Sequence, residues 1–138
     1  MAKTVNQVMT HDPQTIGTDA AAVDDARMMR DADTGIVPIV DGQRVVATIT
    51  DRDIAVRVVA EGSDPGTTRA IDIASRELVT IDPQQDLDEA LRLMARHQVR
   101  RLPVVEEDGR LVGIVAQADV ARHASEKKVG DTVQKISE

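Results

Sequence analysis

The sequence predicts an α+β protein made of two copies of one small unit, related by a pseudo-two-fold axis. Its residues recur at a nearly constant spacing: Pro38 returns as Pro103, 65 residues later, and Asp53 as Asp119, 66 residues later. Within each copy, a helical apolar stripe is followed by short apolar runs typical of strands. A unit of about 50–60 residues would struggle to bury its own apolar face, so we expect the pair to fold together, with ligand clefts where the copies meet. The recurring residues of the first copy are Thr15, Ile16, Arg27, Met29, Pro38, Val40, Arg44, Val46, Asp53 and Ala55.

Local signals in the first copy define each element in turn. Ala22, Ala26 and Met29 have the i, i+4, i+7 spacing of a helix with one buried stripe, which we expect Gly35 to end. Asp41-Gly42 is a hairpin signal between two strands. The expected order is a helical turn (5–9), a loop (10–13), an extended segment (15–16), the striped helix, a buried strand (36–40), a returning strand (45–50) and a helix (51–60) capped by Thr50.

The second copy follows a linker rich in helix-breaking residues and repeats the same order. Asp86 and Glu89 resemble a capping box, which would open a helix with Leu87, Leu91 and Met94 turned inward. The other expected segments are a turn at 71–73, strands at 79–81, 102–105 and 111–115, a turn at Asp108-Gly109 and a helix at 119–124.

Four regions follow from this division of the chain. They are the first copy with its lead-in segment (1–62), the linker (63–69), the second copy (70–125) and a polar tail (126–138). Each copy is expected to form a small, mainly antiparallel sheet with two helices on one face. The helices would also present an apolar edge to a second chain, which predicts a homodimer.

Composition excludes several classes of function. The chain has no Phe, Tyr or Trp, whereas RNA-binding sheets and single-strand-binding barrels stack bases on such rings. A formal charge of −7 opposes contact with nucleic acid or an anionic membrane. Without cysteine, disulfides and thiolate chemistry are excluded. Because no apolar run has the length of a signal core or a bilayer span, we expect a cytoplasmic protein.

The segments GIVPIV (35–40) and ATITDRDI (47–54) resemble those of cystathionine-β-synthase (CBS) domains. The second copy adds VRRLPVV (99–105) and LVGIV (111–115), so the chain looks like a tandem CBS pair, or Bateman module, over about residues 4–124. The segments HQVRR (97–101) and DVARH (119–123) are similar to small stand-alone bacterial proteins of the hypoxic-response type.

This resemblance implies a regulatory module that binds an adenosine-containing ligand, such as AMP, ADP, ATP or S-adenosylmethionine, between the copies. The family's contact is a Ser or Thr followed three residues later by Asp, here Thr50 and Asp53. An Asp carboxylate can accept hydrogen bonds from both hydroxyls of a ribose, and a hydroxyl can donate to phosphate. Adenine would lie among aliphatic groups near Thr15, Ile36 and Pro38.

The second copy departs from this pattern. Asp119 is kept, but Ala116 stands where the hydroxyl residue should be. Arg100 and Arg101 replace Gly35 and Ile36, and guanidinium groups there could pair with phosphate. The expected ligand residues of this copy are Thr80, Arg100, Arg101, Pro103 and Asp119.

Simpler interpretations of the same residues stay open. Thr50 and Asp53 suit a helix cap, and the pair Asp24-Asp25 suits the first turn of a helix. The three histidines lack the spacing of a zinc site, so no metal is expected. No nucleophile, base and donor come together, which argues against an enzyme. The alternative function is a protein-interaction or stress- and dormancy-associated module, with an unidentified protein target and vestigial ligand sites.

Overall fold

The computed structural model describes residues 3–123, which fall into two compact units. One unit comprises residues 12–78 and 107–111, and we call it the first-copy unit. The second-copy unit contains residues 3–11, 79–106 and 112–123 of the described chain. The polar tail predicted at 126–138 lies outside the described residues.

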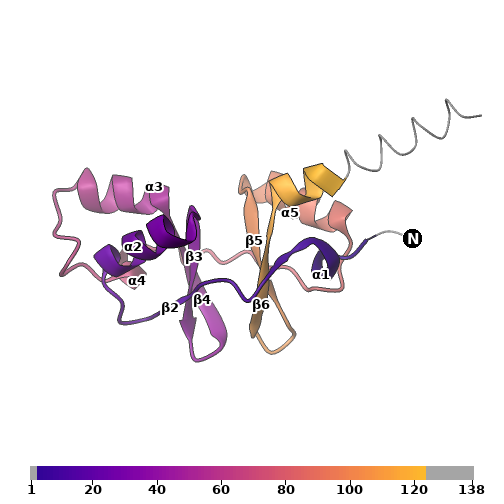
Figure 1. The fold of residues 1–138 in the computed structure, drawn as a ribbon, viewed down its shortest axis with the longest axis horizontal. Coiled ribbons are helices and arrows are strands. Elements are labelled where there is room, and N and C mark those ends of the chain that lie inside the picture. Colours follow the sequence, from indigo (N-terminus) through magenta and orange to yellow (C-terminus); the bar gives the residue numbers. More distant parts are fainter. Residues whose placement is uncertain (1–2, 124–138) are drawn as a thin grey trace, which may run out of the picture. The chain divides into compact units, whose positions relative to one another are not determined.

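The first-copy unit is a three-stranded sheet with its helices on one face (Figure 1). The parallel β2·β3 pair places Ile16 beside Ile39, and β3 and β4 are antiparallel. Side chains of the sheet and helices form one apolar core, which includes Ile39, Ile49 and Val58. The elements are β2 (Ile16–Gly17), α2 (Ala22–Ala32), β3 (Ile36–Asp41), β4 (Arg44–Thr50), α3 (Asp51–Ile54), η1 (Ala55–Val59) and α4 (Ala70–Ile73).

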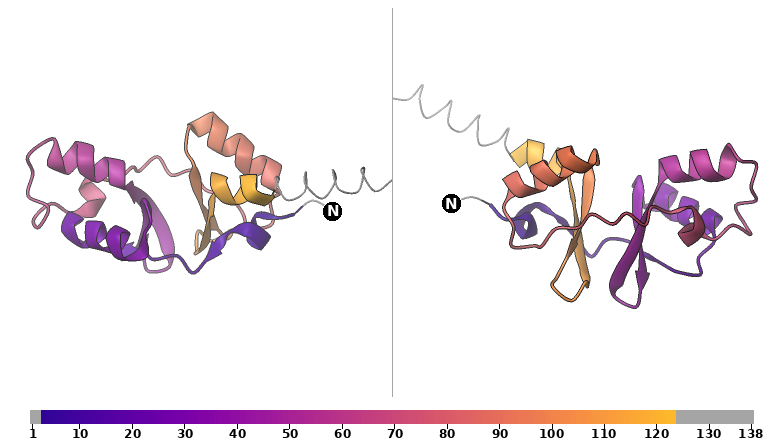
Figure 2. Two further views of the ribbon diagram at one scale, coloured as in Figure 1. Left: turned by 45° about the horizontal axis from the view of Figure 1, so that its top comes forward. Right: turned by 180° about the vertical axis from the view of Figure 1, so that it is seen from behind.

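The second-copy unit repeats this design around its own core, again with the helices on one face of the sheet (Figure 2). Its strand order is β1-β6-β5, and Ile81 makes a parallel bridge to Val104, as Ile16 does to Ile39 in the first copy. The α+β fold with two small sheets is therefore confirmed. The elements are α1 (Val5–Val8), β1 (Thr10–His11), α5 (Leu87–His97), β5 (Arg101–Val105) and β6 (Leu111–Ala116), and residues 117–123 are helical.

The lead-in segments do not pack with the copy that follows them in sequence. Val5 is fully buried in the second-copy core, and its N–H donates to the carbonyl of Gln85 at 2.8 Å. In the same way α4 belongs to the first-copy unit, where the Ala70 N–H donates to the carbonyl of Ala20 at 2.9 Å. Each unit is thus completed by a turn that the sequence places at the start of the other repeat.

The buried stripe of the long helices differs from the prediction by one position. In α2 the buried residues are Ala22, Asp25 and Met29, and in α5 they are Leu87, Ala90 and Met94. The expectation that Ala26 and Leu91 turn inward was therefore wrong; Leu91 is 37% exposed. A period of 3.6 residues lets i+3 and i+4 share a face, and here i+3 lies closer to the sheet.

Four further details correct the expected elements. Asp33, with φ of 52°, ends α2 in the left-handed conformation, two residues before Gly35. The helix predicted at 51–60 changes to a π-helix after Ile54. The predicted loop contains β1, which pairs with β6, because an edge of that sheet lies open to it. The predicted strand at 79–81 is reduced to the single bridge at Ile81.

Candidate functional site

Thr50 and Asp53 form a reciprocal capping box where β4 ends and α3 begins. The Asp53 N–H donates to Thr50 Oγ1 at 3.2 Å, and the Thr50 N–H donates to Asp53 Oδ2 at 2.9 Å. Two backbone donors that the helix leaves unpaired are satisfied in this way. The Asp53 side chain is 14% exposed, so one face of a fixed carboxylate reaches the surface.

Arg57 supports this carboxylate from one turn further along the chain. Its Nη1 lies 4.0 Å from Asp53 Oδ1 and also donates to the carbonyl of Ile73 at 2.8 Å. The second contact holds the guanidinium in place beside the candidate site. Arg57 was not among the residues predicted from the sequence, although its i, i+4 spacing from Asp53 is a recognised signal for an ion pair.

Asp25 is a second carboxyl group near this helix start, and its position was predicted to suit the first turn of a helix. It does lie in the first turn of α2, but it is 0% exposed and neither of its oxygens has a hydrogen-bond partner, which the sequence pattern did not predict. Burial, and then the charge of Asp53, raises the pKa of the Asp25 carboxyl from 3.8 to about 7. The available signal was the repeat itself, since the corresponding residue of the second copy is Ala90.

The other expected ligand residues of the first copy lie at different depths. Ile36 is the register partner of Thr50 in the β3·β4 pair, so the fold brings Ile36, Thr50 and Asp53 together. Pro38 is fully buried within the apolar layer. Thr15 is half-buried in the segment just before β2. The role of these residues in ligand binding stays a prediction.

In the second copy, Asp119 sits in the corresponding helical turn without a hydroxyl partner. It forms an ion pair with Arg122, three residues further on, and Ala116 supplies only a methyl group. The carbonyl of Arg100 accepts the N–H of Gln117 at 2.7 Å, which ties the entrance of β5 to the helix start. Arg101, the first residue of β5, is exposed.

Thr80 and Pro103 complete the expected set of the second copy. Thr80 is half-buried in the irregular segment before Ile81. Pro103 is buried, and its carbonyl accepts the N–H of Ile81 at 3.1 Å. Both residues therefore lie where the repeat relates them to Thr15 and Pro38, and their contact with a ligand stays a prediction.

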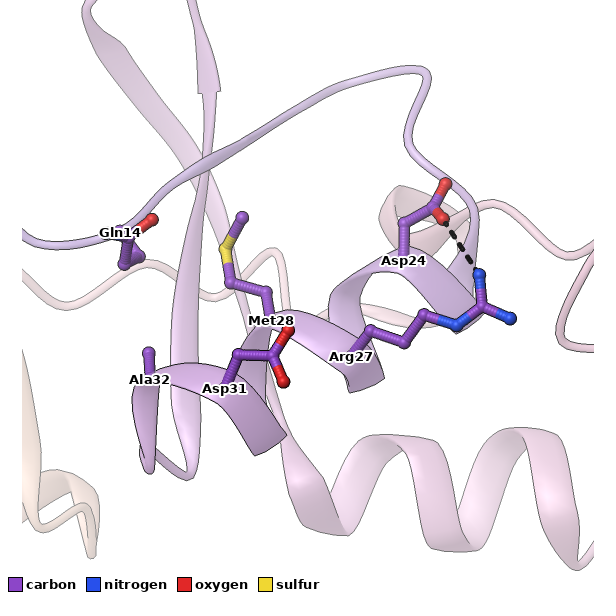
Figure 3. A pocket seen from close by; sticks show the side chains of 6 residues that line it. All are labelled: Gln14, Asp24, Arg27, Met28, Asp31 and Ala32. Carbon is purple, nitrogen blue, oxygen red and sulfur yellow. Dashed lines mark ion pairs between the residues drawn. The ribbon is translucent and has the colours of Figure 1, made fainter.

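A surface hollow of about 400 Å³ lies along α2 and contains none of the predicted site residues (Figure 3). Its lining residues are Gln14, Asp24, Arg27, Met28, Asp31 and Ala32, and an ion pair of 3.9 Å joins Asp24 to Arg27. Among residues 3–123, no group of three His, Cys, Asp or Glu side chains is arranged to hold a metal ion. Within the same range, every helix is too short or too polar to cross a bilayer.

Two units of the same strand and helix order, each with an Asp in the helical turn after its hairpin, define a tandem repeat module. The family model for the CBS domain matches residues 5–60 and 70–126, so the chain belongs to the CBS-domain family as a tandem pair. This confirms the resemblance drawn from the sequence.

Relatives of similar length support this assignment. The chain is 37% identical to the CBS domain-containing protein YhcV of Bacillus subtilis, covering 96% of this chain and 94% of that protein. It is equally similar, at 37% identity, to Hypoxic response protein 1 of Mycobacterium tuberculosis, covering 96% and 93%. Against inosine-5'-monophosphate dehydrogenase of Korarchaeum cryptofilum, the 29% identical match spans only 25% of the enzyme.

Solved structures have the same fold. Hypoxic Response Protein I, crystallised with two coordinated zinc ions, is 38% identical, with a TM-score of 0.81 over 88% of this chain and 98% of that one. The CBS domain pair of MJ0100, in complex with 5'-methylthioadenosine and S-adenosyl-L-methionine, is 25% identical, with a TM-score of 0.82 over 92% and 99%.

Proposed function

We propose that this CBS pair is a regulatory module that binds an adenosine-containing ligand through Thr50 and Asp53. The observation that carries the proposal is the capping box, which fixes a partly exposed carboxylate and a hydroxyl side by side at a helix start. The MJ0100 domain pair supports the class of ligand, since it is described with 5'-methylthioadenosine and S-adenosyl-L-methionine.

The two side chains suit different parts of such a ligand. Asp53 Oδ2 is engaged by the Thr50 N–H, so Oδ1 is the oxygen that would accept hydrogen bonds from a ribose diol. Thr50 Oγ1 accepts a hydrogen bond from the backbone, which leaves its own hydroxyl proton for a phosphate oxygen. AMP, ADP, ATP and S-adenosylmethionine all present at least the ribose.

The second copy would bind such a ligand more weakly or in another orientation. Ala116 cannot donate to phosphate, and the loss of one hydrogen bond costs about 0.5–1.5 kcal/mol, roughly two- to tenfold in affinity. Arg100 and Arg101 provide compensating positive charge, so we assign them to phosphate contact.

The proposed module acts without catalysis and as a homodimer. Val56 and Val59 are 47% and 72% exposed on η1, which leaves apolar surface for a second copy of the chain. A ligand would shift the equilibrium between two arrangements by its difference in affinity for them.

A second candidate is a protein-interaction module associated with stress or dormancy, in which the ligand sites are vestigial. Ala116 favours it, and so does the 37% identity to Hypoxic response protein 1. This function predicts no nucleotide binding by either copy.

Isothermal titration calorimetry with AMP, ADP, ATP and S-adenosylmethionine separates the two candidates. We expect micromolar binding to the natural chain, and a loss of at least tenfold in Asp53→Ala. Asp119→Ala is the matched control, because it makes the same change in the other copy. Equal affinity in Asp53→Ala would place the ligand elsewhere. No heat, together with an unchanged melting temperature at millimolar ligand, would favour the interaction module.

A further inference from the structure

The least expected group in the molecule is the carboxyl of Asp25. It lies on the buried face of α2 between Ala22 and Met29, at 0% exposure. Neither oxygen has a hydrogen-bond partner within the described part of the chain. An ionised carboxylate in such a place loses its hydration without compensation, so the neutral acid is the form that the fold favours.

The charged groups around Asp25 strengthen this preference. Asp53, on α3, is the group whose charge acts on it, and that charge is negative. Arg57 contacts Asp53, not Asp25, and its guanidinium also donates to the carbonyl of Ile73. The remaining charged residues of α2, α3, β3 and the loop packed on the start of α2 are Asp24, Arg27, Arg30, Asp31, Asp41, Asp51, Arg52, Asp64 and Arg69, and all of them are exposed.

The second copy provides an internal comparison. The same position of α5 is Ala90, also 0% exposed, between Leu87 and Met94. An alanine therefore satisfies the packing of this fold, and the carboxyl of the first copy is an addition to it. It stands beside one of the two residues of the capping box, where a change of charge acts directly on the candidate site.

We propose that Asp25 is a buried proton-binding site, which makes the stability of the first-copy unit and of its helix start respond to pH. This proposal does not require that a nucleotide binds. At low pH, the neutral acid packs against α3 without repelling Asp53. At higher pH, the folded unit holds two nearby carboxylates, of which only Asp53 has a cation and a backbone donor.

The direction of the response follows from the protons bound in each state. The pKa of Asp25 rises from 3.8 in the unfolded chain to about 7 in the folded one, so the folded state binds more protons between these values. The contribution is complete below pH 3.8 and is lost as the pH rises through 7. From these two values, the unfolding equilibrium constant rises about two-hundredfold between pH 4.5 and 7.5 through this group alone.

Urea unfolding of the full chain, followed by far-ultraviolet circular dichroism from pH 4.5 to 7.5, tests the proposal. Asp25→Ala gives the first copy the residue that the second copy has at this position. We expect this variant to reduce the rise in the unfolding equilibrium constant between pH 4.5 and 7.5 by at least a factor of ten. Asp24→Ala is the matched control, because it deletes an exposed carboxylate one residue away on the same helix. We expect it to keep the natural pH profile. Parallel profiles for the natural chain and Asp25→Ala would overturn the proposal.

A second measurement applies even where the variant fails to fold. The carboxyl carbon of Asp25 can be followed by ¹³C NMR in the natural chain. A titration midpoint above pH 6 supports the proton site. A midpoint near the ordinary aspartate value of about 4 would overturn it.

Discussion

The close approach of β1 to β6 gives a sharp prediction about packing in the second-copy unit. Gly113 is paired with His11, and a Cβ atom built on it would lie 2.5 Å from Met9 Sδ and 2.7 Å from the Thr10 carbonyl oxygen. Both distances are too short for real contacts, so Gly113→Ala must displace both the Met9 side chain and the backbone of β1 at Thr10.

The magnitude follows from what is displaced. Overpacking a core costs about 1–3 kcal/mol, and moving Met9, now 7% exposed, into water forfeits about 1.5–3 kcal/mol. We therefore expect Gly113→Ala to lower the free energy of unfolding by about 2 kcal/mol. Met9→Ala alone leaves a cavity and should cost about 2–5 kcal/mol.

The first copy indicates how the two changes should combine. Ala47 corresponds to Gly113 and Ala74 corresponds to Met9, and both alanines are buried in the first-copy core. The pair Gly113 and Met9 is therefore one of two ways to fill the same space. The double variant reproduces the first-copy pair. We expect its cost to be smaller than the sum of the single costs by at least about 1 kcal/mol.

Urea unfolding monitored by far-ultraviolet circular dichroism is the assay, because the chain has no Trp or Tyr. Gly17→Ala is the control, since its Cβ meets nothing within 4 Å and its effect should stay within about 0.5 kcal/mol. Costs that add to within about 0.5 kcal/mol in the double variant would refute the claim that Met9 fills the space above Gly113.

Three further changes test the candidate site and the proposed dimer. Thr50→Ala removes the cap and should lower the free energy of unfolding by about 1 kcal/mol in the same urea assay; an unchanged free energy would mean that the cap does not stabilise the fold. Ala116→Thr should raise the calorimetric affinity of the second copy for an adenosine ligand by about two- to tenfold, and an unaltered isotherm would count against a site there. Val59→Glu places a charge on apolar surface and should convert dimers to monomers in sedimentation velocity, whereas a dimer as stable as before would exclude η1 from the interface.

The strands and long helices could be predicted because their signals are local. Apolar runs around Pro38 and Pro103, turn residues after each first strand and helical stripes each arise within a few residues. Corrections came where two nearby positions compete for one face. Asp25 and Ala26 both suit the buried stripe of α2 by spacing, and tertiary packing selects the polar residue, against its hydropathy.

The placement of the lead-in turns could not be predicted from local pattern. Val5 and Gln85 are joined by a backbone hydrogen bond across most of the chain, and no periodicity encodes such a pairing. The internal repeat is nevertheless visible in this pairing. The bridge from Thr4 to Asp86 and the bridge from Ala21 to Arg69 are the same contact in the two copies, with the partners in opposite sequence order.

The candidate site shows the same division between local and distant information. Thr50 and Asp53 were found as a pair because the repeat and the spacing of a cap both single them out. Whether that pair also binds a ligand cannot follow from spacing, since one geometry serves both roles. Arg57 lies within the same local window and was detectable, whereas the position of Asp25 beside Asp53 depends on how α2 packs against α3.

The two copies differ at the strand entrance for a reason that is visible in their packing. In the first copy, the Asp51 N–H donates to the Gly35 carbonyl at 3.0 Å, and a Cβ on Gly35 would lie 3.2 Å from Asp51 Oδ2. A larger residue at that position would have to displace this carboxylate. The second copy has Gln117 in place of Asp51 and Arg100 in place of Gly35.

The two positions in contact thus differ together: Asp51 faces a glycine at the strand entrance of the first copy, whereas Gln117 goes with an arginine in the second. Gln117 keeps the backbone hydrogen bond to Arg100, at 2.7 Å, without adding a carboxylate of its own that would neutralise the guanidinium. A ligand anion would meet positive charge at the second copy and carboxylates at the first. This difference in charge predicts that Asp53 is the residue to test for contact with a ribose, and that Arg100 and Arg101 are the residues to test for contact with a phosphate.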